Sequence, residues 1–421
     1  MFKDRYDNSL NTNSEAAVAG YIEGVDRVLA GSADMCGPFE AALAVDEGFA
    51  LAHAGLARAA VLSGDMPKAK AAIARAKELA EGGDHRVGSH INALGLLFAG
   101  KAAAALEAVR EHVAVYPRDA LVAQLGTSVF GLIGFSGQAG REAELLAYTT
   151  SLAPHYGEDW WFLSQHAFSQ CETGRLTEAD QTIERALAGN PLSAHSAHVR
   201  SHVYYEAGEV DAGISYLEDW LPAYDRGALM HGHLSWHSAL WSLEQGQVDR
   251  MWATVDASVK PDAAQGLPIN VLTDTASILH RAELAGEAVA PERWQQVSDY
   301  AAQFFPKTGQ SFCDMHAALA HAMAGRGDLL AQYLGEANGF AADVVESCAA
   351  SFAALAAKDW SGAANGLAAA MADDARLGGS RAQRDLLDLS MVNALLRQGK
   401  GDEAQLILRM RRPVLQKEAA L

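Results

Sequence analysis

The sequence predicts an all-α protein, a right-handed superhelix of stacked antiparallel helix pairs that runs as one continuous domain over residues 1–421. Proline accounts for only 11 residues of the chain, whereas alanine is abundant. This bias favours helix, because alanine loses no side-chain entropy in a helix and proline breaks one. Apolar segments of helical length repeatedly end in glycine and a polar turn. Neighbouring turn glycines are 36 (64 to 100), 34 (174 to 208) and 38 (208 to 246) residues apart, which is the period of a helix-pair repeat.

The glycine turns divide the chain into its helix pairs. Six turns are clear, and they lie at Gly64-Asp65, Gly100-Lys101, Gly174-Arg175, Gly208-Glu209, Gly246-Gln247 and Gly399-Lys400. Each glycine is expected to end a first helix in the left-handed conformation, which costs little only for glycine. No alternating apolar and polar run of strand length separates these elements, so a sheet is not expected.

Prolines and two irregular stretches mark the remaining boundaries. The second helices are expected to close on Pro117, Pro154, Pro191 and Pro222, because the residue before a proline disfavours the helical conformation. Residues 134–140 and 257–268 interrupt the rhythm and are predicted to be loops within one continuous stack.

Charge and cysteine content predict the setting in which the chain works. The net charge of −19 argues against nucleic acid and anionic membrane surfaces as partners, since both require a surplus of lysine and arginine. The four cysteines lie far apart without a CxxC pair, which favours a reducing compartment. No signal peptide follows the N-terminus, and no apolar run approaches the ~20 residues of a membrane span. We therefore predict a cytoplasmic protein whose partner is a small molecule or short peptide, with homo-oligomerisation left open.

Several segments resemble one family of repeat proteins. They are His166-Ala167-Phe168 with Glu172-Thr173-Gly174-Arg175, the HxxxH segment Ala197 to Val203, Trp236-His237-Ser238-Ala239-Leu240 with Leu243-Glu244-Gln245-Gly246, Asp274-Thr275-Ala276-Ser277, and Asp314-Met315-His316-Ala317. Over roughly residues 40–400 the chain resembles the tetratricopeptide repeat protein 38 group. It departs from the group's pattern at His195-Ser196-Ala197 and at Glu206-Ala207-Gly208. The resemblance implies a tetratricopeptide-repeat-like (TPR-like) solenoid but no defined activity, because the biochemical role of the group is unsettled.

The histidines form the pattern that goes beyond a plain scaffold. His198 and His202 are four residues apart on one predicted helix, and His233 and His237 are four apart on the first helix of the next repeat. Residues spaced by four share a helix face, and successive repeats stack against each other. The four imidazoles are therefore predicted to approach one another.

Two further histidines fall at matching depths in their repeats. His316 lies nine residues before Gly325, as His237 does before Gly246, and His90 lies ten before Gly100, as His198 does before Gly208. Residues at matching depths tend to line one inner face. Asp274 and Asp314 are the carboxylates expected to orient these rings.

We assign candidate roles from this pattern. The candidate catalytic residues are His198, His202, His237, Asp314 and His316; the candidate ligand-binding residues are His90, Trp161, His166, Arg200, His233 and Asp274; the candidate metal ligands are His198, His202, His233 and His237. Neutral imidazoles bind transition metals and also act as acids and bases near pH 7, so a divalent metal is the cofactor considered. The alternative is that each histidine is packed and hydrogen bonded without any chemical role. The HxxxH segments lack the internal glutamate of a zinc protease helix.

Three functions remain open on this reading. The favoured one is binding of a small polar ligand or peptide in a His-rich concave channel centred on residues 160–320. The second is a hydrolase or lyase that uses the same His and Asp residues, with or without a metal. The third is a protein-interaction scaffold that holds a partner's terminal segment. The sequence contains no GxSxG elbow, no GxxxxGK[ST] loop and no GxGxxG after a strand.

Overall fold

A computed structural model describes residues 2–411. In that range the protein contains 22 α-helices, four short 3-10 or π segments, and one isolated antiparallel bridge between Lys3 and Ser9, with no named strand. The predicted fold class, an all-α stack of antiparallel helix pairs, is confirmed. No helix among the described residues is long and apolar enough to cross a membrane.

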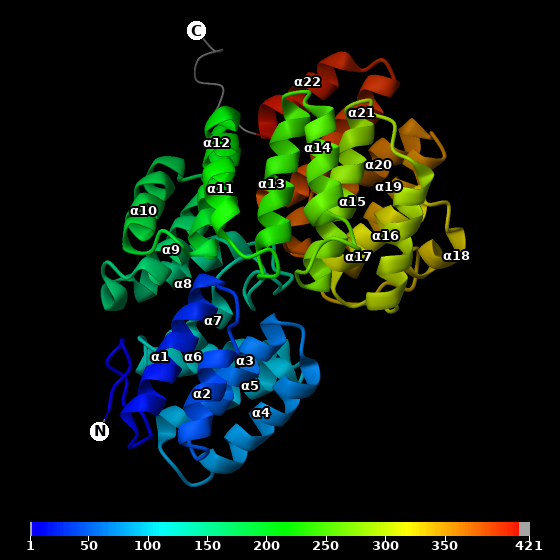
Figure 1. The fold of residues 1–421 in the computed structure, drawn as a ribbon. Coiled ribbons are helices and arrows are strands. Elements are labelled where there is room, and N and C mark those ends of the chain that lie inside the picture. The colour runs from blue at the N-terminus through cyan, green and yellow to red at the C-terminus, as the bar shows by residue number, and fades with distance from the viewer. Residues whose placement is uncertain (1, 412–421) are drawn as a thin grey trace.

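The helices form two tiers that are visible in Figure 1. The first tier holds α1 (Glu15–Ala30), α2 (Gly37–Val45), α3 (Ala50–Leu62), α4 (Met66–Ala80), α5 (His85–Phe98), α6 (Ala102–Val115) and α7 (Ala120–Gly126). The second tier begins with α8 (Arg141–Tyr156), α9 (Trp160–Glu172), α10 (Leu176–Gly189), α11 (Ala194–Ala207), α12 (Val210–Trp220), η1 (Leu221–Ala223), α13 (His231–Glu244), α14 (Val248–Thr254), η2 (Val255–Val259) and α15 (Pro268–Leu284). The last elements are α16 (Pro291–Phe304), α17 (Ser311–Met323), α18 (Gly327–Leu330), η3 (Ala331–Tyr333), α19 (Ala342–Ala356), α20 (Trp360–Met371), η4 (Asp374–Leu377), α21 (Arg381–Arg397) and α22 (Gly401–Arg411).

The glycine turns lie where the sequence places them. Gly64, Gly174 and Gly399 each have φ of 77°, and Gly208 has φ of 73°. At the end of α11 the Gly208 N–H donates to the carbonyls of Tyr204 and Tyr205. This pattern of hydrogen bonds closes the helix through a left-handed residue, as expected for a glycine cap.

Two predicted boundaries differ in detail. Pro154 lies inside α8, two residues before its end, rather than beyond it. Residues 134–140 form a loop as predicted, but the segment predicted as a loop from residue 257 begins inside a π-helical turn, η2, that extends α14. Proline lacks an N–H and its ring crowds the carbonyl four residues before it, and α8 accordingly ends within one turn of Pro154.

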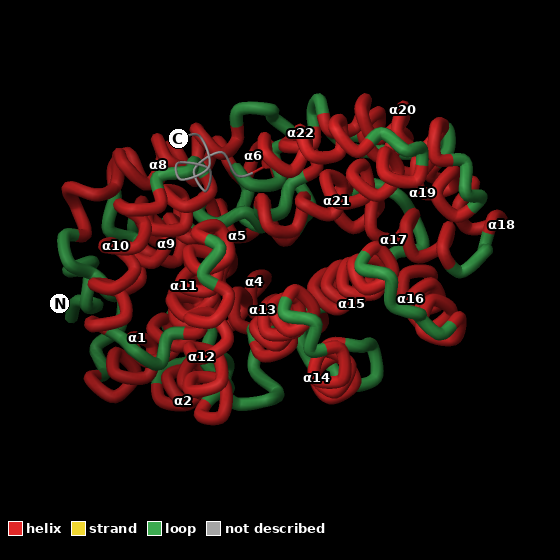
Figure 2. Tube along the Cα trace, turned by 90° about the horizontal axis from the view of Figure 1, so that it is seen from above, coloured by secondary structure: helices red, strands yellow, loops and turns green. Residues whose placement is uncertain are grey.

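The chain turns back on itself at its C-terminal end. Helix α21 packs against α15 and also contacts α11, and η4 contacts α8. Seen from above, α11, α13 and α15 follow one another along one side while α21 lies across from them (Figure 2). The superhelix therefore has an interior bounded on both sides by helices.

Close packing in the first tier depends on two glycines that flank one ring. Phe39 is completely buried and its ring lies against Gly24 and Gly55. A Cβ on Gly24 would meet the Phe39 Cε2 atom at 2.7 Å, and a Cβ on Gly55 would come closer still to the same ring. The absence of a side chain at Gly55 is therefore what lets α3 approach the ring.

We expect Gly55→Ala to lower the free energy of unfolding by about 1–3 kcal/mol, because the added methyl overpacks a core that has no room to yield. Urea denaturation measures this change. The matched control is Gly88→Ala in α5, where an added Cβ meets nothing within 4 Å. There alanine should stabilise the helix by about 0.5–1 kcal/mol, so the two substitutions should have opposite signs.

Candidate functional site

The four predicted histidines lie together in the interior. His198 and His202 project from α11, and His233 and His237 from α13; one nitrogen of each ring lies within 4.8 Å of one nitrogen of every other. The Nε2 atom of His198 lies 2.8 Å from Nε2 of His202 and 3.1 Å from Nε2 of His233. All four side chains are buried. The spacing of four along each helix brings both pairs to one point, as predicted.

Helix α15 supplies the carboxylate that orients this cluster. Asp274 Oδ2 lies 2.8 Å from Nδ1 of His233, and both residues are buried. Burial raises the pKa of Asp274, and the neighbouring His233 ring counteracts this rise. In the arrangement that suits a carboxylate, the Nδ1–H of His233 donates to Asp274, and Nε2 of the same ring faces His198.

Burial acts on the protonation of two of these rings. Burial, followed by the neighbouring imidazoles, holds the pKa of His198 and of His237 well below the ordinary value. Neither ring nitrogen of His237 has a hydrogen-bond partner among the described residues. The cluster is thus a set of converging imidazole nitrogens, and its His198 and His237 rings favour the neutral form.

A cavity of about 550 Å³ opens beside the cluster, between the two tiers. His198, His202 and His233 contribute to its wall, whereas His237 lies behind them. Most of the remaining wall is apolar, with side chains such as Leu62, Phe98, Leu125, Leu132 and Phe168. The lining residues Met66, Gly100 and Ala102 are exposed, which places the mouth at the turns that follow α3 and α5.

Among the described residues, Arg58 of α3 is the one Lys, Arg, Asp or Glu residue that lines this wall. Its Nε and Nη2 atoms donate to Gln124 Oε1 at 3.3 and 3.2 Å, and it forms no ion pair within the described range. Burial lowers the pKa of Arg58 to about 10. The neighbouring His195 has its pKa lowered to about 4, first by burial and then by Arg58.

Three predicted ligand-binding residues lie elsewhere, and these assignments are corrected. Trp161 is fully buried and packs edge-on against Tyr156. His166 bonds to Thr149 Oγ1 through Nδ1 at 3.0 Å. Arg200 pairs with Asp180 and with Glu184 at 3.0 Å. The cavity wall includes none of them, because α9 and α11 turn these positions toward neighbouring helices.

Asp314 and His316 also do not join the cluster. Asp314 accepts from the Gly309 N–H at 2.8 Å, and burial raises its pKa to about 7. His316 places Nδ1 2.8 Å from the Phe312 carbonyl, and burial lowers its pKa to about 4. Matching depth in a repeat did not bring His316 to the same place as His237, because α17 lies beyond α15 in the stack.

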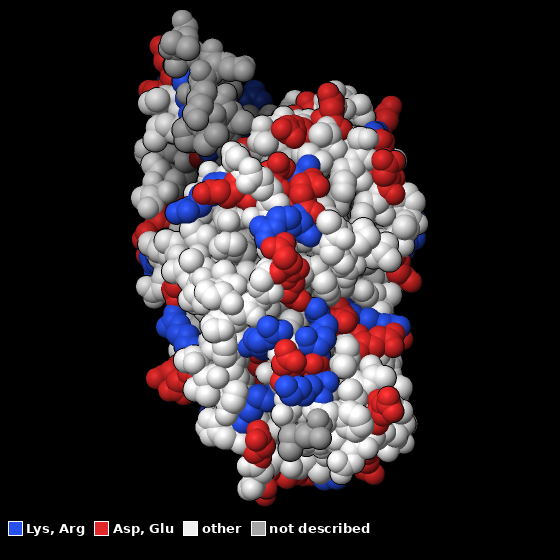
Figure 3. Space-filling view, turned by 90° about the vertical axis from the view of Figure 1, so that its left-hand side faces the viewer, with Lys and Arg blue, Asp and Glu red and all other residues white. Residues whose placement is uncertain are grey.

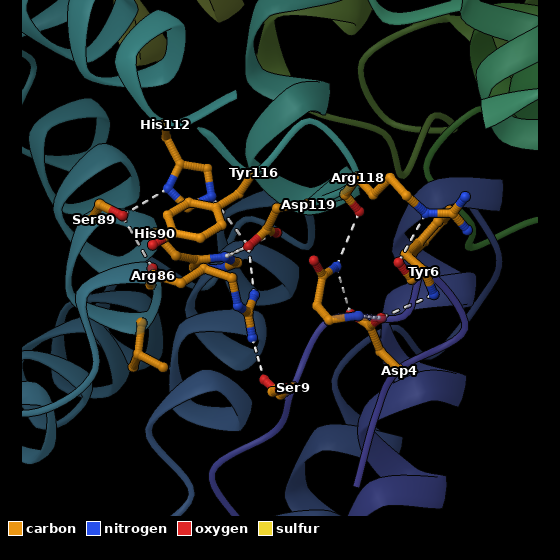
Figure 4. A network of polar contacts seen from close by, with 12 residues as sticks. Asp4, Tyr6, Ser9, Arg86, Ser89, His90, His112, Tyr116, Arg118 and Asp119 are labelled. Carbon is orange, nitrogen blue, oxygen red and sulfur yellow. Dashed lines mark hydrogen bonds and ion pairs between the residues drawn. The ribbon is translucent and has the colours of Figure 1, made fainter. Parts of the chain in front are cut away.

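His90 belongs to a second cluster in the first tier, together with His112 and Asp119 (Figure 4). The Nδ1 atom of His90 lies 3.0 Å from both oxygens of Asp119, and Nε2 of His112 lies 3.2 Å from Oδ2. Arg86 Nη1 donates to the same Oδ2 at 2.7 Å. The guanidinium already pairs with the carboxylate that a metal ion would need, so these residues form a buried ion-pair network, and His90 is not part of the cavity wall described above.

Sequence reasoning missed Arg58, Gln124 and His195 as site residues. Two of them belong to the first tier, outside the predicted channel centre at residues 160–320. One signal was available for Arg58, since it is the single charged residue in α3, whose sequence is otherwise apolar apart from His53. His195 is three residues before His198 on the same helix, a spacing that places both near one face.

These features define a TPR-like helical-repeat protein with a His-lined interior cavity. No family model matches the chain, so membership of the predicted tetratricopeptide repeat protein 38 group stays a prediction. Solved structures with a similar helix arrangement include an IFIT1 monomeric mutant with Gppp-AAAA, at 11% identity and TM-score 0.48, over 97% of this chain and 96% of that chain. A human IFIT1 dimer with m7Gppp-AAAA has 12% sequence identity and a TM-score of 0.47, over 99% of this chain and 97% of that chain. Yeast Tom70 has 14% sequence identity and a TM-score of 0.34, over 94% of this chain and 91% of that chain. At these values the likeness concerns the fold alone.

The prediction that nucleic acid is excluded as a partner does not stand, because the net charge from which it was drawn does not describe a local binding site. Helical-repeat chains of similar arrangement are solved with Gppp-AAAA, m7Gppp-AAAA and PPP-AAAA. The reasoning failed because a net charge sums over the whole molecule, whereas a binding site is local. On the face shown in Figure 3, acidic and basic side chains are interspersed and form no single acidic patch. The −19 charge therefore does not describe the interior, where the cavity wall carries Arg58 and no carboxylate.

Proposed function

We propose that this protein binds a small organic anion, a carboxylate or phosphate ester with an apolar body, in the cavity between its two tiers. The observation that carries the proposal is Arg58, a cation on the cavity wall that donates to the neutral Gln124 and forms no ion pair with the described residues. A charge that is partly removed from water and lacks a counter-ion is costly. An anionic group from outside the chain would supply the missing partner, and bidentate binding to carboxylate or phosphate is what a guanidinium favours.

The remainder of the wall supports the same ligand class. Polar groups from Gln124, Gln165 and Asn270 and the rings of His195 and His198 stand among apolar side chains. A small number of polar groups on an apolar wall is typical of small-molecule sites, and about 550 Å³ lies in their usual size range. The apolar body of the ligand would contact side chains such as Phe98, Leu125 and Phe168.

The two other predicted functions receive less support. A scaffold that holds a partner segment needs an open groove, whereas this space lies between tiers with its exposed lining confined to the turns after α3 and α5. A hydrolase or lyase needs a group free to exchange a proton with the substrate. The Nε2 atoms of His198, His202 and His233 are directed at one another instead.

Anionic and neutral probes of similar shape test this proposal. We expect 1-anilinonaphthalene-8-sulfonate to bind the wild-type protein with enhanced fluorescence, and Arg58→Met to weaken that binding roughly 10- to 100-fold, since a charge-assisted hydrogen bond contributes about 1.5–3 kcal/mol. The uncharged analogue N-phenyl-1-naphthylamine should bind both proteins within about threefold, because it buries the same apolar surface.

The control variant is Arg75→Met, which removes an exposed arginine that pairs with Glu78 on α4. It should leave both probes unaffected. Arg58→Met should also leave the melting temperature unchanged or higher, because it removes an unpaired cation from a partly buried position. Equal loss of both probes, or no loss of either, would refute the assignment of Arg58 as the anion-binding group.

A further inference from the structure

We propose that His198, His202, His233 and His237 bind one divalent transition-metal ion. The first observation is the convergence of their nitrogens. Two imidazole nitrogens bound to one ion at about 2.0–2.1 Å, at right or tetrahedral angles, lie about 2.8–3.4 Å apart. The two Nε2 to Nε2 distances here are 2.8 and 3.1 Å, and the fourth ring lies within 4.8 Å of the others.

The second observation is that protons alone leave this cluster unsatisfied. The Asp274 carboxylate accepts a hydrogen bond from the Nδ1–H of His233, so Nε2 of that ring in its neutral form offers only a lone pair. A single N–H on His198 or His202 cannot satisfy three converging nitrogens, and both nitrogens of His237 lack a partner in the described chain. Each buried polar atom left this way is costly, whereas one ion accepts all the lone pairs at once.

The third observation is the carboxylate of Asp274, which holds the His233 ring from the side away from the other three. A metal-bound histidine usually donates its other N–H to a carboxylate or carbonyl, which fixes the tautomer and raises its basicity. Asp274 holds His233 in this way at 2.8 Å and is the buried negative charge that would partly balance the ion. Imidazole donors favour zinc, copper, nickel, cobalt or iron over calcium and magnesium.

The site faces the cavity but does not depend on the anion proposed above. Because His198, His202 and His233 line the wall, a ligand in the cavity could complete the coordination of the ion. The second group of metal-type residues, His90, His112 and Asp119, serves as an internal comparison. Arg86 already neutralises its carboxylate at 2.7 Å, so we expect no metal there.

Metal binding can be measured on the tag-free, full-length protein after chelation and dialysis, without any organic ligand. With Zn²⁺ we expect one ion per chain by elemental mass spectrometry, and with Co²⁺ a visible absorption band of low-coordinate cobalt. The double variant His202→Gln, His237→Gln should lose at least tenfold in affinity for Co²⁺. The matched control His90→Gln, His112→Gln should retain one ion per chain. Asp274→Asn should weaken binding roughly 10- to 100-fold through loss of the orienting hydrogen bond.

The outcomes separate clearly. No uptake of Zn²⁺ or Co²⁺ by the wild type at micromolar concentration would overturn the proposal, and so would equal uptake by the wild type and the His202, His237 double variant. Circular dichroism checks that each variant folds. If the double variant does not fold, X-ray absorption of the zinc-loaded wild type decides: three or four imidazoles around the ion support the site, and fewer overturn it. The sulfonate probe assay is run in chelator, so failure of one proposal leaves the other measurable.

Discussion

Replacing Asp119 by asparagine is expected to lower the free energy of unfolding by roughly 3–5 kcal/mol, the usual cost of breaking a buried ion pair from one side. The Asp119 carboxylate accepts from Arg86 at 2.7 Å and meets the rings of His90 and His112 at 3.0 and 3.2 Å (Figure 4). Asparagine removes the charge but leaves the buried guanidinium in place. Arg86 also donates to the Ser9 carbonyl at 2.5 Å, so the N-terminal segment should loosen with it.

The pH dependence of this effect follows from the same contacts. Burial alone would raise the pKa of Asp119, but His90, His112 and Arg86 outweigh it and hold that pKa well below the ordinary value. A folded-state pKa below the unfolded one means that the stabilisation is present above the unfolded pKa of about 3.9 and is lost as pH falls toward the folded pKa. The wild type should therefore exceed Asp119→Asn in stability by a constant amount above about pH 5 and lose this advantage below about pH 4.

Urea denaturation at several pH values measures both effects. The control is Asp299→Asn, which removes an exposed carboxylate that pairs with Arg326 at 3.1 Å and should cost less than about 1 kcal/mol. A cost below 1 kcal/mol for Asp119→Asn as well would mean that the buried network rearranges around the amide and does not depend on the charge.

The sequence could predict the parts of this structure that depend on local backbone geometry and on spacing along one helix. A glycine at the end of a helix needs a left-handed backbone whatever lies around it, so the turns at Gly64 and Gly208 could be placed from the sequence. Two histidines four residues apart share a helix face by construction. The meeting of the two pairs needed only one further step, that α11 and α13 are neighbours in the stack.

The parts that could not be predicted depend on contacts between distant repeats. Arg58 and His198 are 140 residues apart (198 − 58) and reach the same cavity only because the tiers pack together. His90 shares its depth in a repeat with His198 but bonds Asp119 from the following loop, which no periodicity specifies. Adjacent tryptophans 160 and 161 point in different directions, and sequence alone does not tell which of them is buried.

Arg141→Met is expected to lower the free energy of unfolding, because Arg141 makes the hydrogen bonds that join α8 to the segment before α21. Arg141 has no exposed surface, and its guanidinium donates to the Ala375 and Gly379 carbonyls at 2.5 and 2.6 Å and to that of Gly134 at 3.3 Å. Methionine fills similar space but removes all three hydrogen bonds. The Gly379 carbonyl still accepts from Arg384, and that of Ala375 from the Gly378 N–H, so the carbonyl of Gly134 loses its donor. With about 1–3 kcal/mol for that unsatisfied group and about 0.5–1.5 kcal/mol for each of the other two lost hydrogen bonds, we expect a loss of roughly 2–5 kcal/mol.

One opposing effect is smaller. Burial and the neighbouring Arg384 lower the pKa of Arg141 to about 10, so removing its charge relieves some repulsion. Glu142 keeps its contact with Arg384 in the variant, and no carboxylate is left alone. Relief of one screened repulsion does not offset three lost hydrogen bonds to buried carbonyls, so the net change should remain destabilising.

The location of the damage distinguishes this variant from a general loss of core packing. Hydrogen exchange should accelerate in residues 374–384 and in the loop 127–140, which Arg141 ties together, before it accelerates in α3 or α4. Because that loop lines the cavity at Phe130 and Phe135, Arg141→Met should also weaken binding of the sulfonate probe although Arg58 is intact. The control Arg110→Met removes an exposed arginine of α6 that pairs with Glu144 on α8, the helix that carries Arg141. It should change neither the hydrogen exchange nor the binding of the sulfonate probe. If Arg141→Met leaves exchange in 374–384 unchanged, the closure instead depends on the aromatic contacts of Phe312 with Phe130 and Phe135, at ring separations of 5.6 and 6.3 Å.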